Sequence, residues 1–132
     1  QNSLARIVLK KHPRHPAQGL LTKLHWLPIE HRIKFKLATI TYKALSLNQP
    51  SYILSRLHPY QPAYHTRSAD QKLLAKPTCS TSFGQRAFSY AAPQIWDKIP
   101  LDTRVSTSIE SFKRKLKSHF WTSLDLSVTF PA

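Results

Sequence analysis

A long segment with apolar positions on two sides dominates the hydrophobic pattern of this chain. From Leu24 to Leu47 it reads LHWLPIEHRIKFKLATITYKALSL, and Pro28 suits the first position of a helix, where its missing N–H costs nothing. Helical spacing gives one side Ile29, Ile33, Leu37, Ile40 and Ala44, and another side Phe35, Ala38, Tyr42 and Leu45. We therefore expect a central helix that packs between other elements.

The chain ahead of this helix predicts two short helices joined by a turn. Residues 4–8 have apolar positions at helical spacing, and so do residues 20–24, which lead to Trp26. Between them, the His-Pro-Arg-His-Pro run of residues 12–16 is expected to be a turn or an extended linker, because each proline disfavours helix at the residue before it.

The chain beyond the central helix begins with a stop signal, Asn48-Gln49-Pro50. Pro50 then suits the start of a short helix with Tyr52, Ile53 and Leu57 facing inward. Prolines and small polar residues predict a loop-rich connector over residues 58–82, with one strand at 72–76 and a pairing partner near 80–83.

Helical spacing returns in residues 84–100, GQRAFSYAAPQIWDKIP. Pro93 is expected to end one helix and begin another, or to kink the pair. Phe88 and Trp96 recur at helical spacing, which favours packing in a core over stacking on bases.

The last helix is the best-marked one. Thr107 and Glu110 form a capping box with Thr107 as the N-cap. A narrow apolar stripe follows at Ile109, Phe112, Leu116 and Phe120, and the tail at 123–132 is expected to fray. Together the patterns predict a mainly α protein: a small helical domain with a long central amphipathic helix and a minor β-hairpin element.

Charge changes this picture, because 20 Lys and Arg oppose 6 Asp and Glu in 132 residues, a formal net charge of +14. Such an excess indicates an acidic partner, most commonly nucleic acid. An anionic membrane surface is the alternative, although no apolar run approaches a spanning length. The candidate phosphate-contacting residues are Lys10, Lys11, Arg14, Arg32, Lys36, Lys43, Lys113, Arg114, Lys115 and Lys117. A merely solvated surface is the alternative for those of the first segment.

Catalytic and metal chemistry find little support in the sequence. The six acids are scattered, without the close pairs that hold catalytic cations, and no phosphate loop or Gly-x-Ser-x-Gly occurs. His12 and His15 are separated from any helix by prolines, and the single Cys79 excludes a Cys-rich zinc site. We expect no catalytic residue, metal or cofactor. One cysteine also fits a reducing compartment, nuclear or cytoplasmic.

Six blocks in order carry a family resemblance: QNSLARIVL, LHWLP with RIKFKLATITYKAL, PSYILSRLHPY, RSADQKLLAKP, GQRAFSYAAPQIWDKIP and SIESFKRKLKSHF. They resemble the C-terminal region of the reverse transcriptase of non-LTR (LINE-type) retrotransposons, in the jockey-like and chicken-repeat branch. The resemblance covers about residues 1–120. It implies that residues 1–49 end a thumb-like helical region and that residues 50–132 form a C-terminal helical extension. The family's Tyr-x-Asp-Asp polymerase motif and its endonuclease are missing from this chain.

The resemblance therefore implies an accessory role rather than a catalytic one. We expect a nucleic-acid-binding region whose basic helices contact the backbone of RNA, DNA or a hybrid, beside an upstream polymerase domain and not on a membrane. One alternative is a protein-interaction module that packs on that polymerase core. The other is a retroelement remnant without a selected function.

Overall fold

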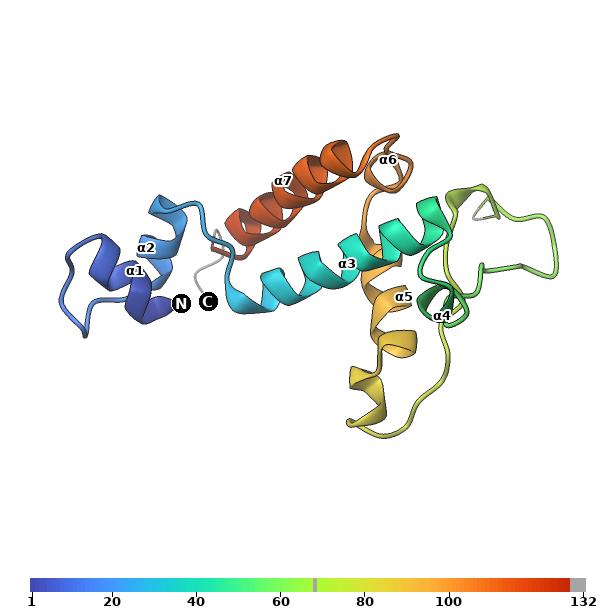
Figure 1. Ribbon diagram of the computed structural model, residues 1–132, viewed down its shortest axis with the longest axis horizontal. Helices are drawn as coiled ribbons and strands as arrows, with labels where there is room; N and C mark the ends of the chain where they lie inside the picture. Colours follow the sequence, from blue (N-terminus) through green and yellow to red (C-terminus); the bar gives the residue numbers. More distant parts are fainter. Residues whose placement is uncertain (68, 129–132) are drawn as a thin grey trace. The chain divides into compact units, whose positions relative to one another are not determined.

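Helices form nearly all the regular structure of the chain. The computed structural model describes residues 1–67 and 69–128, with side chains as far as residue 124. In chain order the elements are α1 (Asn2–Val8), α2 (Gln18–Lys23), α3 (Ile29–Leu47), α4 (Ser51–Leu54), the 3₁₀ turns η1 (Ala69–Gln71) and η2 (Gly84–Arg86), α5 (Phe88–Lys98), α6 (Leu101–Arg104) and α7 (Ile109–Val128) (Figure 1). The mainly α prediction is confirmed.

The chain folds into two compact units, Gln1–Ile33 and Lys34–Ala132, here called unit 1 and unit 2. The division falls inside α3, whereas the sequence places a boundary at 49/50. That boundary is implied by the family resemblance and stays a prediction. Each unit has buried residues of its own.

Unit 1 is built from α1 and α2, which confirms the two short helices expected there. Ala5, Leu20 and Leu21 form its core, and Leu9, Leu24 and Trp26 pack against them. Apolar residues on the other side of α1 remain exposed; they are Leu4, Ile7 and Val8. The small side chain of Ala5 allows the close approach of α2.

Both helices of unit 1 end in the same way. Lys10 and His25 adopt left-handed backbone conformations with φ of 50° and 53°. The next residue donates its N–H to the carbonyl five positions back, over 2.8 Å from Lys11 and 2.9 Å from Trp26. This is the Schellman ending, in which glycine usually occupies the left-handed position. The chain's two glycines lie elsewhere, so a lysine and a histidine carry the strained conformation.

Unit 2 is organised around Phe112, which is fully buried on α7. Its ring stacks on Tyr42 of α3 with a centroid separation of 4.3 Å, and the ring of Trp96 from α5 lies 6.1 Å away. Leu116 and Phe120 extend the same buried stripe. Figure 1 shows α7 running back along the unit 2 part of α3 in the opposite direction. The predicted stripe of α7 and the core position of Trp96 are confirmed.

The two apolar sides predicted for α3 are confirmed only in part. Ala38, Tyr42 and Ala44 are buried, but Ile29 and Ile33 are 61% and 56% exposed, so the prediction is wrong for these two. Two threonines that the apolar pattern passed over, at 39 and 41, are buried instead. Each hydroxyl donates to the carbonyl four residues earlier, both over 2.8 Å, which satisfies the buried polar group.

The predicted β-hairpin is wrong. Leu74 forms a single antiparallel bridge with Pro59, flanked by two backbone hydrogen bonds of 2.9 and 2.8 Å, and the expected partner at 80–83 takes no part. Residues 80–83 instead enter a tight turn, in which the Gly84 N–H donates to the Thr81 hydroxyl over 3.1 Å. The side chain–backbone bonds of this turn compete with strand pairing.

Pro93 does not divide the helix, because α5 continues through it. The proline is buried, and burial of its apolar ring offsets part of the roughly 3 kcal/mol cost of a proline in a helix interior. The expectation of two separate helices at this point is therefore wrong.

Helix ends and short helices bring three further corrections. Ser108, rather than Thr107, caps α7: its hydroxyl accepts the Ser111 N–H over 3.2 Å, and α7 begins one residue later than expected. The tail does not fray from residue 123, since α7 continues to Val128; residues 129–132 lie outside the described part. Tyr52 is 72% exposed rather than inward, although Leu57 is buried.

Candidate nucleic-acid interface

The strongest candidate surface is a basic strip on α7, formed by Lys113, Arg114 and Lys117. Helical periodicity puts Arg114 opposite the buried Phe112 and Leu116, and it puts Lys117 and Lys113 on the flank that leads back to the buried stripe. Arg114 and Lys117 are exposed, while Lys113 is half-buried and lies 3.9 Å from a carboxylate oxygen of the exposed Glu110. Such a surface pair contributes little, so it leaves Lys113 able to contact a phosphate. We call these residues the α7 strip.

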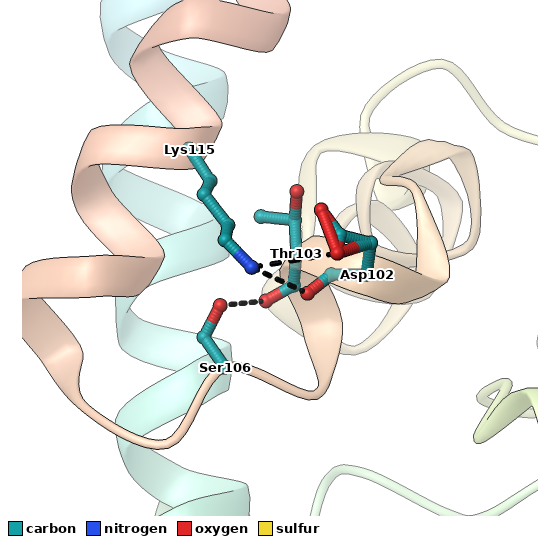
Figure 2. Close-up of polar contacts among 4 residues, drawn as sticks. All are labelled: Asp102, Thr103, Ser106 and Lys115. Atoms are coloured by element: carbon teal, nitrogen blue, oxygen red, sulfur yellow. Dashed lines mark hydrogen bonds and ion pairs between the residues drawn. The ribbon is translucent and has the colours of Figure 1, made fainter.

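Lys115 does not belong to this strip. Its Nζ lies 3.4 Å from Oδ1 of Asp102 and donates to the Asp102 carbonyl oxygen over 3.3 Å. Figure 2 shows the side chain reaching from α7 toward Asp102, beside the hydrogen bond from the Ser106 hydroxyl to the Thr103 carbonyl. Lys115 therefore helps to dock α6 on α7, and its ammonium is partly committed before any ligand arrives.

The basic side of α3 also stays in solvent. Lys36 and Lys43 are exposed and lie two helical turns apart on the one side of the unit 2 segment that carries no buried residue. Arg32, in the part of α3 that belongs to unit 1, is exposed as well. The positive seam expected from the sequence is thus a solvent-facing feature of this helix.

Lys10, Lys11 and Arg14 are the exposed cations of unit 1 in the turn after α1. The predicted turn is present: the His15 N–H donates to the His12 carbonyl over 2.9 Å, and the Arg6 Nε donates to the His15 carbonyl over 2.9 Å. Arg6 therefore holds the turn, and the turn gathers the other three cations within a few residues.

The described residues contain no group of three or more His, Cys, Asp and Glu side chains arranged to hold a metal ion. His12 accepts the Arg14 N–H on Nδ1 over 3.2 Å. Asp97 is the least exposed of the three ion-paired carboxylates in the described part of the chain; it accepts the Leu74 N–H over 3.0 Å and pairs with Lys76 over 3.6 Å. Asp97 therefore joins α5 to the segment of Leu74 and Lys76, which is a structural role.

A buried cation lies in the interior of unit 2. Arg104 is only 7% exposed, and its Nε and Nη1 have no hydrogen-bond partner in the described part of the chain. Burial lowers the pKa of this guanidinium below its ordinary value, and the negative charge of Asp97 acts in the opposite direction. Arg104 is therefore inaccessible to a phosphate backbone.

Sequence reasoning missed a second basic surface. Arg56, His58 and Lys76 line a cavity of about 300 Å³, together with the hydroxyl-bearing Ser55 and Ser89. Arg56 and His58 lie in one segment and Lys76 in another, and the Pro59–Leu74 bridge brings these two segments together. No periodicity in the sequence links them, so no sequence signal identifies the cavity.

Comparisons with known proteins found no relative of this chain: no family model, curated protein or solved structure matches it. Among the described helices, none has both the length and the apolarity that crossing a bilayer requires. The exposed cations of α7, of α3 and of the turn after α1, and the basic cavity, are therefore the features that bear on function.

Proposed function

We propose that this chain is a non-catalytic nucleic-acid-binding accessory region of a retrotransposon reverse transcriptase. The observation that carries the proposal is the number of cations left without an acidic partner. Against 20 Lys and Arg, the described residues form ion pairs only at Lys76, Lys113 and Lys115. A surface of this kind attracts a polyanion and releases counterions when it binds.

The arrangement of these cations supports contact with the phosphate backbone. Lys and Arg on helix surfaces bind phosphates without reading the sequence of bases. Of the two aromatics weighed for base stacking, Trp96 is buried and Phe88 is half-buried. The indole N–H of Trp96 donates to the Lys72 carbonyl over 3.1 Å. Binding through the α7 strip, Lys36 and Lys43 is therefore expected to be largely independent of base sequence.

The retrotransposon part of the proposal rests on the ordered sequence blocks. They imply that an upstream polymerase domain of the same polyprotein is a partner and that the template, the product strand or their hybrid is the ligand. The single cysteine, which fits a reducing compartment, supports a nuclear or cytoplasmic location. In this role the chain would hold nucleic acid near a polymerase whose catalytic carboxylates lie in another part of the polyprotein.

Fluorescence anisotropy with single-stranded RNA, duplex DNA and an RNA–DNA hybrid, each over a salt series, tests the proposal. Replacing Lys113, Arg114 and Lys117 by Gln should reduce the steepness of log K against log salt by about 2 to 3 for a duplex, since each phosphate contact contributes close to one. The matched control replaces Lys23, Arg67 and Lys98, which are exposed and lie outside the proposed surfaces. An equal effect of both triple variants would mean that net charge alone governs binding.

A protein-interaction module is the second candidate, favoured by the exposed apolar side of α1. Leu4, Ile7 and Val8 are 58%, 71% and 54% exposed, and they follow helical spacing along one face of unit 1. The sequence resemblance makes the upstream polymerase domain the expected occupant. Sedimentation of the chain with and without Leu4→Ser and Ile7→Ser tests this candidate. If the wild-type chain and the variant are both monomers with the same sedimentation coefficient, the result argues against an apolar face that mediates association.

A further inference from the structure

We infer that the cavity between α4, the Pro59–Leu74 bridge and the start of α5 is a binding site for a phosphate group. Its titratable lining is entirely basic, consisting of Arg56, His58 and Lys76, and no acidic residue is among the described residues that line it. Ser89 adds a hydroxyl group, the Ser55 hydroxyl donates to the Tyr52 carbonyl over 3.0 Å, and Ala75 and Pro77 form an apolar part of the wall. We call this cavity the phosphate pocket.

Its basic residues are held in place by the fold. The Ala75 N–H donates to the His58 carbonyl over 2.8 Å, which brings the segments of His58 and Lys76 together. Lys76 is further positioned by Asp97, whose carboxylate lies 3.6 Å from its Nζ and whose side chain is 11% exposed. The side chain of Lys76 remains 47% exposed, so its ammonium can still reach a ligand. Arg56 follows α4, and its N–H donates to the Ile53 carbonyl over 3.0 Å.

The pocket also adjoins the first turn of α5, where Ser89 is the second residue. This helix is 11 residues long, and no side chain caps its N-terminus, because Ala87 occupies the N-cap position. The amide groups of an uncapped first turn carry a partial positive charge that favours an anion. The helix end supports a site that the three basic side chains already define.

The donor inventory indicates phosphate rather than a carboxylate. A guanidinium, an ammonium, an imidazole and the Ser89 hydroxyl offer more N–H and O–H groups than the two oxygens of a carboxylate accept, even though the Ser55 hydroxyl already donates to the Tyr52 carbonyl over 3.0 Å. A phosphate accepts through three or more oxygens and pairs well with Arg and Lys. The volume of about 300 Å³ equals roughly ten water molecules. The pocket therefore has room for a phosphate group together with part of its ester.

A neighbouring cavity of about 570 Å³ shares Lys76 and Pro77 with the pocket and continues past Tyr90 and Thr78. A ligand longer than one phosphate could therefore leave the pocket along this second hollow. A nucleic-acid strand, with one backbone phosphate in the pocket, has the required length and chemistry. A small phosphate ester is the other source of the same group, and the assignment to a strand rests on the proposed function.

The first experiment titrates inorganic phosphate into the full chain and follows amide ¹H–¹⁵N shifts at constant ionic strength, with chloride as the exchanged ion. We expect saturable shifts at Arg56, His58, Lys76 and Ser89 that exceed those on α7. The double variant Arg56→Gln/Lys76→Gln should bind phosphate at least about tenfold more weakly, since charge-assisted hydrogen bonds contribute on this scale. Shifts spread evenly over all basic residues would overturn the site.

Two controls keep this result interpretable. Lys23→Gln/Lys98→Gln removes the same charge from exposed positions outside the pocket and should leave phosphate binding unchanged. Because Lys76→Gln also breaks the pair with Asp97, Arg56→Gln alone provides a variant with no ion pair to lose in the described part of the chain. Arg56→Gln with undiminished phosphate affinity would contradict the assignment.

The second experiment separates the two sources of phosphate. If a strand occupies the pocket, Arg56→Gln/Lys76→Gln lowers the salt dependence of RNA binding by about one or two contacts, and the Lys23/Lys98 control does not. Phosphate binding in the pocket with unchanged RNA binding would assign it to a small phosphate ester. Failure of the wild-type chain to bind RNA or DNA would remove the proposed function, while pocket shifts with inorganic phosphate would still establish the site.

Discussion

Unit 1 and unit 2 are stabilised in different ways. The core of unit 1 consists of one alanine and two leucines on two short helices. The side-chain amide of Gln1 also donates to the Leu27 carbonyl over 2.7 Å, a hydrogen bond between residues 26 positions apart. Unit 2 contains the stacked rings around Phe112 and the hydrogen bond from the Tyr42 hydroxyl to the Ser106 carbonyl, over 2.6 Å. That bond joins residues 64 positions apart.

This difference between the cores indicates which unit should unfold cooperatively. A few short apolar side chains stabilise only weakly, whereas buried aromatic rings each remove a large apolar area from water. Unit 1 depends mainly on local contacts and helix endings, and unit 2 on contacts between distant segments. We therefore expect unit 2 to unfold as one cooperative body and unit 1 to open at a lower free energy.

The largest expected effect comes from removing the central ring of unit 2. Phe112→Ala should cost about 3 to 5 kcal/mol in the free energy of unfolding, because it leaves a cavity between Tyr42 and Trp96. Native-state hydrogen exchange would report the loss residue by residue. Protection should fall across α5 and α7 and stay unchanged in α1 and α2. A parallel loss in both units would mean that they fold as one body.

An intermediate effect tests the buried charges of unit 2. Asp97→Ala should cost about 2 to 4 kcal/mol, because it leaves the Leu74 N–H without its acceptor and removes the negative charge that opposes the desolvation of Arg104. Urea unfolding measures this change. A loss below 0.5 kcal/mol, on the order of the experimental error, would show that water replaces the carboxylate.

Arg104→Met is the matched control, and we expect it to change the free energy of unfolding in the opposite direction from Asp97→Ala. Burial lowers the pKa of Arg104, so the charged form is the one that the fold disfavours. This penalty is present at every pH below the folded-state pKa and disappears only under strongly alkaline conditions, where arginine loses its proton. Arg104→Met should therefore be neutral or stabilising by about 1 kcal/mol, equally at pH 5, 7 and 9. A gain confined to one of these pH values would contradict this account.

The smallest effect belongs to unit 1. Lys10→Gly relieves the left-handed conformation at the end of α1 and should stabilise unit 1 by up to about 1 kcal/mol, since the steric relief exceeds the extra entropy of glycine in the unfolded chain. Exchange rates of the amides in α1 should slow, and those in α7 should not change. Ser3→Gly, at an exposed position of the same helix, is the control and should destabilise.

The sequence predicts elements better than it predicts their partners. Periodicity located α3, α5 and α7, because local spacing sets which positions share a helix face. No strand forms over residues 72–76: Leu74 alone makes a bridge, to Pro59 rather than to residues 80–83, where a hydrogen bond to Thr81 forms a turn. Strand pairing depends on which distant segment is available, and local pattern contains no such information.

The candidate interface likewise has a part that the sequence predicts and a part that only the fold decides. Of four basic residues predicted on α7, three form the α7 strip, while Lys115 is bound to Asp102 of α6. Net charge is a property of composition, whereas the freedom of a given ammonium depends on what the fold places next to it. The phosphate pocket is the extreme case, since Arg56 and His58 come from one segment and Lys76 comes from another.

By itself the sequence determined the helical character of this protein, the excess of positive charge and the buried stripe of α7, because composition and short-range spacing are read along the chain. The tertiary structure decided that Thr39 and Thr41 would be buried while Ile29 and Ile33 stay exposed. It also decided that Lys115 would be engaged and that Arg56 and Lys76 would meet at one cavity. The physical reason is that burial and charge pairing are set by neighbours distant in sequence, whose positions are fixed only when the whole unit packs.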